Sequence, residues 1–277
     1  FSSFRIRAFR LHILIYIFSF TAMDVFGSVF TYYVVYCLSQ DASAVSGWLS
    51  IAAFASVPGT YGFMLLLNRL NMTPSAALRL AYGCIILVLA FLFTVYLTKT
   101  QVPTLLFSAV FILLGAARSG LYYIPWNIYS FIPDIDGMVT QQRREGIFAG
   151  VMVLTRKSTV AIAIMIIGLV LQESGFVKGS GAQPESALGA IIGLMIFATA
   201  ALLAVSFFAT YKFKLTRETH KVLLKEIARR KRGGDYRDCD DSTRVVIKQL
   251  TGYEYDQVWG GDATRRAVGK VNLSTAK

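Results

Sequence analysis

Charge, histidine and cysteine are all scarce in this sequence of 277 residues. Asp, Glu, Lys and Arg together make up 16% of it, whereas hydrophobic residues make up 55%, which is too apolar for an ordinary soluble domain. The two histidines and three cysteines do not have the spacing of metal ligands, and no Ser–His–Asp set marks a hydrolase. The composition therefore argues against a soluble domain, a metal-binding module and an enzyme.

Long apolar blocks take the place of these residues. Each has 20 or more residues, enough for a helix to cross the ~30 Å hydrocarbon core of a bilayer. We expect six spans, at about 11–38, 45–67, 78–97, 103–131, 147–171 and 188–211, with a kink at Pro58 and an interruption at Pro125. The predicted fold class is an all-α polytopic membrane protein, with a transmembrane bundle over residues 1–211 and a tail over 212–277.

Basic residues are distributed unequally between the two sides of this bundle. One side receives Arg5, Arg7, Arg10, Arg69, Arg79, Arg143, Arg144 and the tail from Lys212, and the other receives Lys99 and Lys178. The positive-inside rule then predicts that both ends of the chain lie in the cytoplasm, with a bacterial inner membrane as the expected location. Because the net charge of +12 flanks the spans or crowds the tail, it does not indicate a nucleic-acid partner.

The tail contains two predicted helices separated by acidic residues. Residues 216–232 form a basic helical pattern that either meets anionic lipid head groups or is simply solvated. A second helical pattern covers residues 243–250. Between them lie Asp235, Asp238, Cys239, Asp240 and Asp241. We expect flexible surface there rather than a metal site.

One charged residue lies near the middle of the first span. Thr21, Ser28 and Thr31 share a helical face with Asp24. Charge inside hydrocarbon costs roughly 2.5–3.5 kcal/mol per residue at a helix centre. The stripe is therefore expected to line a polar cavity, the alternative being a seam of hydrogen bonds between helices.

The fourth span also carries a charge near its middle. Arg118 continues a face with Tyr122, Pro125 and Tyr129, at a depth similar to that of Asp24. We expect Asp24 and Arg118 to form an ion pair, which would lower the cost of both charges. The pair would be either purely structural or opened by a substrate.

The fifth span carries two adjacent cations. Lys157 lies at roughly 15 Å depth by helical rise, on a face with Gly150, Ala161 and Gly168. Its ammonium can donate three hydrogen bonds to a substrate, or its side chain can extend to the interface. Arg156 points about 100° away from it and has no clear partner in the sequence.

A polar turn links the fourth and fifth spans. The chain leaves the fourth span through Pro125, Trp126 and Asn127. The turn is then predicted to hold Asp134, Asp136, Arg143, Arg144 and Glu145 before the chain re-enters apolar sequence.

This arrangement resembles the glycoside–pentoside–hexuronide:cation symporters, the melibiose-permease-like branch of the major facilitator superfamily. That family has a turn with acidic residues, a basic pair, Glu-Gly, and a lysine twelve residues after the glutamate. Here the matching residues are Asp134 and Asp136, Arg143-Arg144-Glu145-Gly146, and Lys157. FTYYVVYCL (30–38) resembles the family's Tyr-Tyr signature, which ends the seventh helix. YKFKLTRETH (211–220) resembles the end of the family sequence after the twelfth helix. The likeness covers about residues 4–232.

The resemblance implies the C-terminal half of a twelve-helix transporter that moves a sugar or glycoside with H⁺ or Na⁺ by alternating access. The missing N-terminal half would be its partner and would hold most of the site for the coupling ion. The expected substrate contacts are Lys157, Asp24, Arg118, Tyr122, Trp126 and Asn127, and the expected gating residues are Asp134, Asp136, Arg143, Arg144 and Glu145.

Other functions remain open. The same fold could carry an amphiphile or lysolipid, and a channel subunit or a membrane anchor would be a non-transporting alternative. His12 and His220 lie at the membrane edges, where we expect a plain surface role. Since Phe1 is not a natural start, we expect the sequence to be partial.

Overall fold

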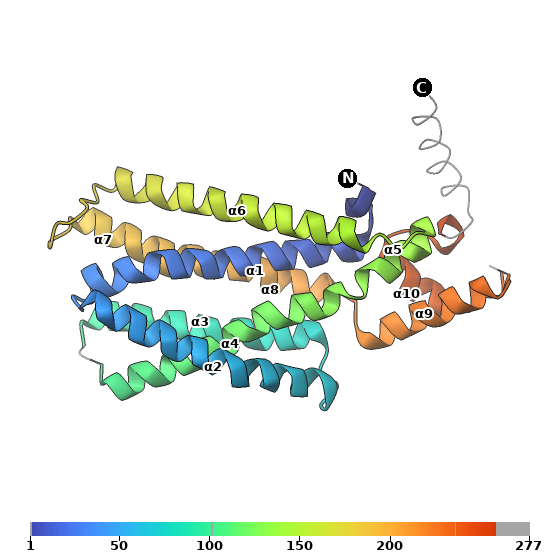
Figure 1. Cartoon of the computed structure of the whole chain (residues 1–277), viewed down its shortest axis with the longest axis horizontal. Coiled ribbons are helices and arrows are strands. Elements are labelled where there is room, and N and C mark those ends of the chain that lie inside the picture. Colours follow the sequence, from blue (N-terminus) through green and yellow to red (C-terminus); the bar gives the residue numbers. More distant parts are fainter. Residues whose placement is uncertain (1, 101, 236, 259–277) are drawn as a thin grey trace, which may run out of the picture. The chain divides into compact units, whose positions relative to one another are not determined.

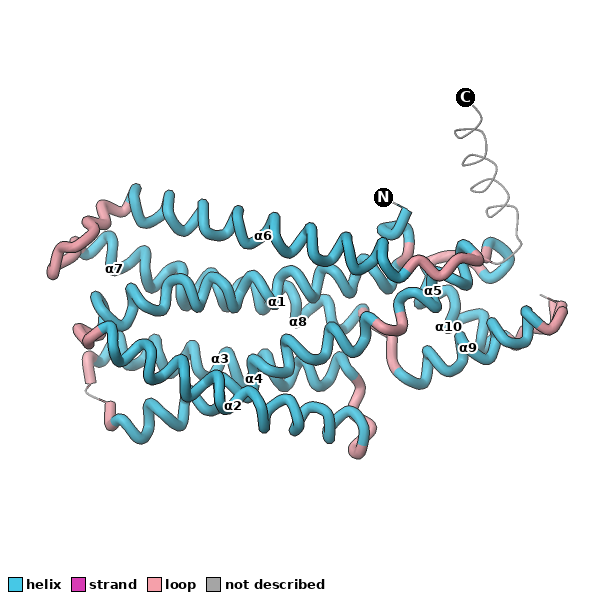
Figure 2. Tube along the Cα trace, in the orientation of Figure 1, coloured by secondary structure: helices cyan, strands magenta, loops and turns pink. Residues whose placement is uncertain are grey.

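The computed structural model describes residues 2–100, 102–235 and 237–258, and every regular element in these ranges is a helix (Figures 1 and 2). The α-helices are α1 (Arg7–Tyr32), α2 (Ala42–Asn68), α3 (Pro74–Thr98), α4 (Thr104–Tyr129), α5 (Ile132–Thr140), α6 (Glu145–Glu173), α7 (Glu185–Ile192), α8 (Thr199–Lys212), α9 (Arg217–Lys231) and α10 (Asp241–Thr251). Short helical turns are η1 (Ser2–Arg5), η2 (Tyr33–Cys37), η3 (Gly193–Ala198) and η4 (Tyr255–Gln257).

Among the described residues, six helical stretches are long and apolar enough to cross a membrane. They are Arg7–Cys37, Ser43–Asn68, Pro74–Thr98, Thr104–Thr140, Glu145–Glu173 and Glu185–Lys212. The predicted number of spans is confirmed, and the protein is an all-α polytopic membrane protein. The expected interruption at Pro125 was wrong, because α4 continues through this residue. Membrane helices tolerate proline where neighbouring groups satisfy the freed carbonyl.

The chain divides into two compact units. The bundle unit comprises Leu14–Pro125 and Leu154–Thr210. The loop-and-tail unit comprises Phe1–Ile13, Trp126–Val153 and Tyr211–Lys277. Residues that are distant in sequence therefore meet within each unit, and the two units are described separately below.

Helix α1 contributes most to the core of the bundle unit. In the most apolar stretch of each span, 61% of the residues are buried for α1, against 17% for α2 and 11% for α6. Polar groups join α1 to its neighbours: the Ser19 hydroxyl lies 2.8 Å from Tyr82 Oη of α3 and 3.2 Å from Ser206 Oγ of α8. Ser and Thr commonly hold membrane helices together in this way. The weakly buried α2 and α6 leave the largest free faces.

Helices α2 and α4 approach each other at glycines. A Cβ placed on Gly115 of α4 would lie 2.0 Å from the Ala52 carbonyl oxygen of α2. A Cβ on Gly59 of α2 would lie 2.6 Å from the Cα of Ala116. Small residues are what permit backbones to approach so closely in a membrane. These two positions therefore require glycine because of packing.

In the loop-and-tail unit, α5, α9 and α10 pack around one small apolar core. Its fully buried side chains include Ile135, Met138, Leu223, Ile247 and Leu250. The segment predicted as a polar turn is thus largely helix α5, because its apolar residues recur at helical spacing and Pro133 lies in its first turn. The correction places Asp134 and Asp136 on a helix, and leaves residues 141–144 as the connection to α6.

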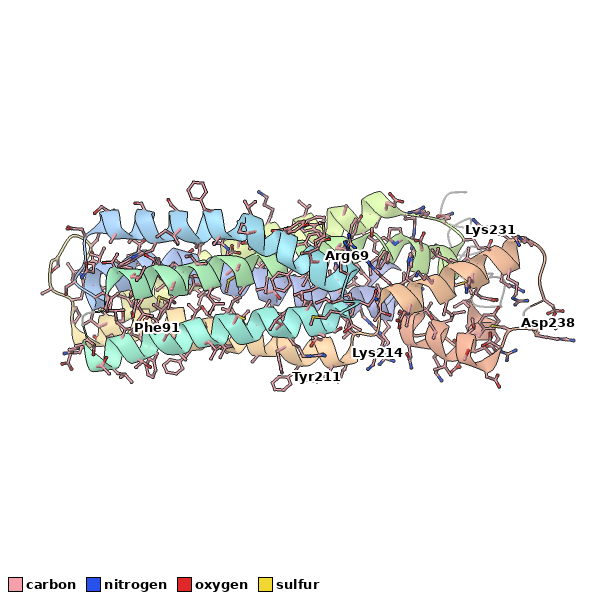
Figure 3. All side chains as sticks on the ribbon, turned by 90° about the horizontal axis from the view of Figure 1, so that it is seen from below. Arg69, Phe91, Tyr211, Lys214, Lys231 and Asp238 are labelled. Atoms are coloured by element: carbon pink, nitrogen blue, oxygen red, sulfur yellow. The ribbon has the colours of Figure 1, made fainter. Side chains whose placement is uncertain are left out.

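The two helices predicted in the tail are confirmed as α9 and α10. Lys214, just before α9, and Lys231, its last residue, are labelled in Figure 3. The acidic segment is not simply flexible surface. Cys239 is buried, and Asp240 accepts a hydrogen bond from Thr243 N as the N-cap of α10. Hydrogen bonds from Ser242 and Thr243 lower the pKa of Asp240 to about 2. Among the described residues, no group of three or more His, Cys, Asp or Glu could hold a metal ion.

Candidate functional site

An ion pair links two spans of the bundle unit. Arg156 of α6 donates from Nη2 to Asp24 Oδ1 of α1 at 2.8 Å, and its Nη1 lies 2.5 Å from Oδ2. The expected pair between Asp24 and Arg118 was therefore wrong, as was the view that Arg156 lacks a partner. The reason is visible in α6: Arg156 shares its helical face with Ala163 and Ile167, which are both buried. Because α6 is apolar on almost all sides, its sequence carries little signal for which of the two cations points inward.

Aromatic rings surround this pair. The guanidinium of Arg156 lies 5.1 Å from the centroid of the Phe20 ring, a cation–π distance. Phe20 in turn contacts Tyr16 of the same helix and Tyr122 of α4, with ring centroids 4.5 Å apart in each case. The pair and the rings bring α1, α4 and α6 together at one place.

Arg118 reaches the same place from α4. Its Nη2 donates to Tyr122 Oη at 3.1 Å, and its Cζ lies 5.2 Å from the centroid of that ring. The two residues are one helical turn apart, which explains the contact. We define the central cluster as Asp24, Arg156, Phe20, Tyr122 and Arg118. It supplies hydrogen-bond donors, one carboxylate and aromatic faces within the membrane spans.

Lys157 does not join the central cluster. It is exposed in the bundle unit, about 18 Å along α6, and has no hydrogen-bond or ion-pair partner among the described residues. A Cβ on Gly150 or Gly168 would meet nothing within 4 Å, so this face of α6 is open. A substrate contact for Lys157 stays a prediction.

An apolar groove lies beside the central cluster. It is an open groove of about 400 Å³ between α1, α6 and the η3–α8 span, and its lining includes Val25, Ala163, Ala198 and Ala201. Only Thr21 and Thr159 contribute hydroxyl groups to it. The groove therefore lacks the hydrogen-bonding groups that a sugar ring requires.

In the loop-and-tail unit, the predicted gating residues form ion pairs. Arg144 donates to both carboxylate oxygens of the fully buried Asp136, from Nε at 2.8 Å and from Nη2 at 2.7 Å. Bidentate pairs between arginine and a carboxylate are among the strongest hydrogen-bonded interactions in proteins. The hydrogen bonds that Arg144 donates to Asp136 raise the pKa of Arg144, which is fully charged at any physiological pH.

A second ionic group connects the loop to the tail. Arg143 lies 2.7 Å from Glu145 and 3.5 Å from Asp134. Asp134 also lies 2.9 Å from Nε2 of His220 in α9, and the His220 ring stacks on Phe131 at 4.2 Å. The expected surface role of His220 was therefore wrong, because α9 packs on α5.

The remaining expected site residues also lie in the loop-and-tail unit. Trp126 is 42% exposed, with its ring 5.7 Å from that of Tyr129, and Asn127 is half-buried. The expected substrate contacts thus fall in two units. His12, for which we also expected a surface role, is instead buried, with its ring 6.3 Å from that of Phe213.

Tail residues that sequence reasoning did not single out form a further polar group. Glu226 of α9 accepts hydrogen bonds from Arg229, at 2.9 and 2.8 Å, and from the Tyr255 hydroxyl. Burial opposes ionisation, but these hydrogen bonds outweigh it and lower the pKa of Glu226. Burial, together with the bond to Glu226, raises the pKa of Tyr255. This group holds η4 against α9.

The chain thus has six helices that are long and apolar enough to cross a membrane, and three of them carry a charged and aromatic cluster. The family model described as MFS/sugar transport protein matches residues 2–217. A protein described as an uncharacterized symporter from Synechocystis sp. is 31% identical over 195 residues, which cover 68% of this chain and 35% of that protein. The chain therefore belongs to the MFS/sugar transport protein family, and it spans about a third of the length of this relative.

Proposed function

We propose that the chain is the C-terminal part of a secondary active transporter that moves a sugar or glycoside with H⁺ or Na⁺ by alternating access. The central cluster carries this proposal, because a membrane anchor does not need an ion pair and a second arginine within its spans. Membership of a sugar transport family and likeness to a protein described as a symporter support it.

The central cluster would contact the substrate. Arg118, Tyr122 and the Asp24–Arg156 pair offer donors and acceptors for sugar hydroxyls, and Lys157 would complete the site from the open face of α6. Trp126 and Asn127 are proposed as additional contacts. The open faces of α2 and α6 would meet an N-terminal half of the same protein, which would hold most of the coupling-ion site.

The ionic groups of α5 and the connection to α6 would act in gating. Asp136 with Arg144, and Asp134 with Arg143 and Glu145, would hold one access state closed. Glu145→Gln removes one charge of this set and is expected to change the transport rate more than the substrate affinity. Unchanged rates with normal insertion would leave these residues only a topological role.

The proposed orientation follows from charge. Most loop arginines and lysines, and the basic α9, fall on one side of a six-span topology. This side would be the cytoplasm, and the membrane a bacterial inner membrane.

Ion-driven uptake by the full-length protein in liposomes tests the proposal. Labelled methyl glycosides should accumulate when an inward H⁺ or Na⁺ gradient is imposed, and Asp24→Asn should reduce this accumulation at least tenfold. The 277-residue chain alone should not transport, because half of the substrate cavity would be absent. Ion conductance without saturable sugar uptake would instead indicate a channel, and neither activity would indicate an anchor.

A further inference from the structure

We propose that the groove between α1, α6 and the η3–α8 span binds the apolar aglycone of a glycoside substrate. This inference rests on the proposed function, and it adds a second subsite to the central cluster. The transporter would then prefer alkyl or aryl glycosides over free sugars.

The size and lining of the groove define the chemistry that it accepts. The open groove offers about 400 Å³ between side chains that are almost all aliphatic, and three of them are alanines, Ala163, Ala198 and Ala201. A sugar cannot satisfy its hydroxyl groups against such a lining. Water would be equally poorly held, since a stable buried water needs two to four polar partners. An alkyl or aryl group is the ligand that the lining favours.

Two residues link this groove to the central cluster. Thr21 lines the groove one helical turn from Asp24, on the same side of α1. Thr159 lines it from α6 and donates from its hydroxyl to the Arg156 carbonyl oxygen at 3.1 Å. The ion pair and the groove are therefore carried by the same two helices, one turn apart on each. A ligand with a polar head and a short apolar tail matches this juxtaposition.

Thr21 provides an independent observation at the junction. Its hydroxyl oxygen is buried and has no hydrogen-bond partner among the described residues. A buried polar group without a partner costs about 1–3 kcal/mol, so such groups are commonly satisfied by a ligand or water. The glycosidic oxygen of a bound glycoside lies between sugar and aglycone, and it would accept this hydrogen bond.

A chain-length series tests the proposal with the full-length protein in liposomes. Methyl, butyl and hexyl β-glucosides, and the matching β-galactosides, would compete for ion-driven uptake of the labelled methyl glycoside. In the wild type, each added methylene should tighten binding about threefold to fourfold until the groove is full. A flat series with normal methyl glycoside uptake overturns the inference and leaves the proposed function intact. Absence of uptake for every glycoside overturns both.

Substitutions that fill the groove provide the second arm. Ala198→Phe with Ala201→Phe should abolish the dependence on chain length while methyl glycoside uptake changes less than threefold. Ala200→Phe, on the neighbouring residue of α8 that does not line the groove, should retain the wild-type series. If the filled variant keeps the chain-length dependence, the aglycone binds elsewhere. If it loses all uptake while Ala200→Phe does not, another segment of the protein occupies the groove.

A variant with an enlarged groove tests the proposal even if the filled variant does not fold. Ile166 lines the groove from α6, and Ile166→Ala should move the optimum of the series to a longer chain. An unchanged optimum in this variant contradicts the assignment. If a bilayer lipid permanently occupies the groove, neither filling nor enlarging the groove should alter the chain-length series.

Discussion

Breaking the Asp24–Arg156 pair is the perturbation with the largest expected effect. The two contacts of 2.8 and 2.5 Å join side chains that are 22% and 19% exposed, so the pair is largely shielded. Removing one partner of a fully buried pair costs about 3–5 kcal/mol. With about a fifth of each side chain exposed, we expect Asp24→Asn or Arg156→Gln alone to lower the free energy of unfolding by about 2–3 kcal/mol. The double variant leaves no unpaired charge and should lose much less than the sum.

Unfolding of the full-length protein in mixed detergent micelles measures this directly. The coupling energy of the Asp24→Asn and Arg156→Gln cycle should be about 1.5–2.5 kcal/mol. The matched control is the cycle of Asp24→Asn with Arg118→Gln. Its coupling energy should be less than about 0.5 kcal/mol, because Arg118 contacts Tyr122 instead. Additive effects in the first cycle, or strong coupling in the second, would refute the pairing described here.

Three further outcomes are expected. Gly115→Val should lower the free energy of unfolding by about 1–3 kcal/mol, because the valine side chain would separate α2 from α4. Gly83→Val should not lower it, because a Cβ at this position meets nothing within 4 Å. Because the pKa of Glu226 is lowered in the folded protein, its carboxylate stabilises the tail at neutral pH, and this contribution is lost as the pH falls through that lowered value. Glu226→Gln should therefore weaken hydrogen-exchange protection of α9 by about 1 kcal/mol at pH 7, and equal protection of wild type and variant at pH 7 would contradict this. Lys157→Arg should weaken substrate binding nearly as much as Lys157→Ala, by roughly tenfold to a hundredfold, because a planar guanidinium does not replace a compact ammonium. Normal affinity in the alanine variant would show that Lys157 is not part of the site.

The spans were predictable because their signal is local. A block of 20 apolar residues specifies a membrane helix regardless of its neighbours, and all six predicted spans are present. The helices α9 and α10 were likewise predictable from their own periodicity. Helix α5 was missed because its charges suggested a turn, whereas its apolar residues are buried by α9 and α10, far away in sequence.

Side-chain pairing was harder to predict because it depends on how helices rotate against each other. The sequence predicts similar depths for Asp24 and Arg118, but depth alone does not determine which way each side chain points. The buried residues on the same helical face as Arg156 show that its side chain points into the bundle. The contact of His220 with Asp134 depends on where α9 docks, and nothing local to either residue indicates it.

The central claim is that the Asp24 face of α1 lines the path of the substrate. Ser28 is exposed on this face one turn beyond Asp24, and Leu87 of α3 is an exposed residue outside the cluster. In full-length protein whose own cysteines are replaced, Ser28→Cys should react with a membrane-impermeant thiol reagent, and a saturating transported glycoside should slow this reaction at least fivefold. Leu87→Cys should show no protection. A Ser28→Cys variant that does not react, or that reacts equally fast with and without the glycoside, would contradict the account.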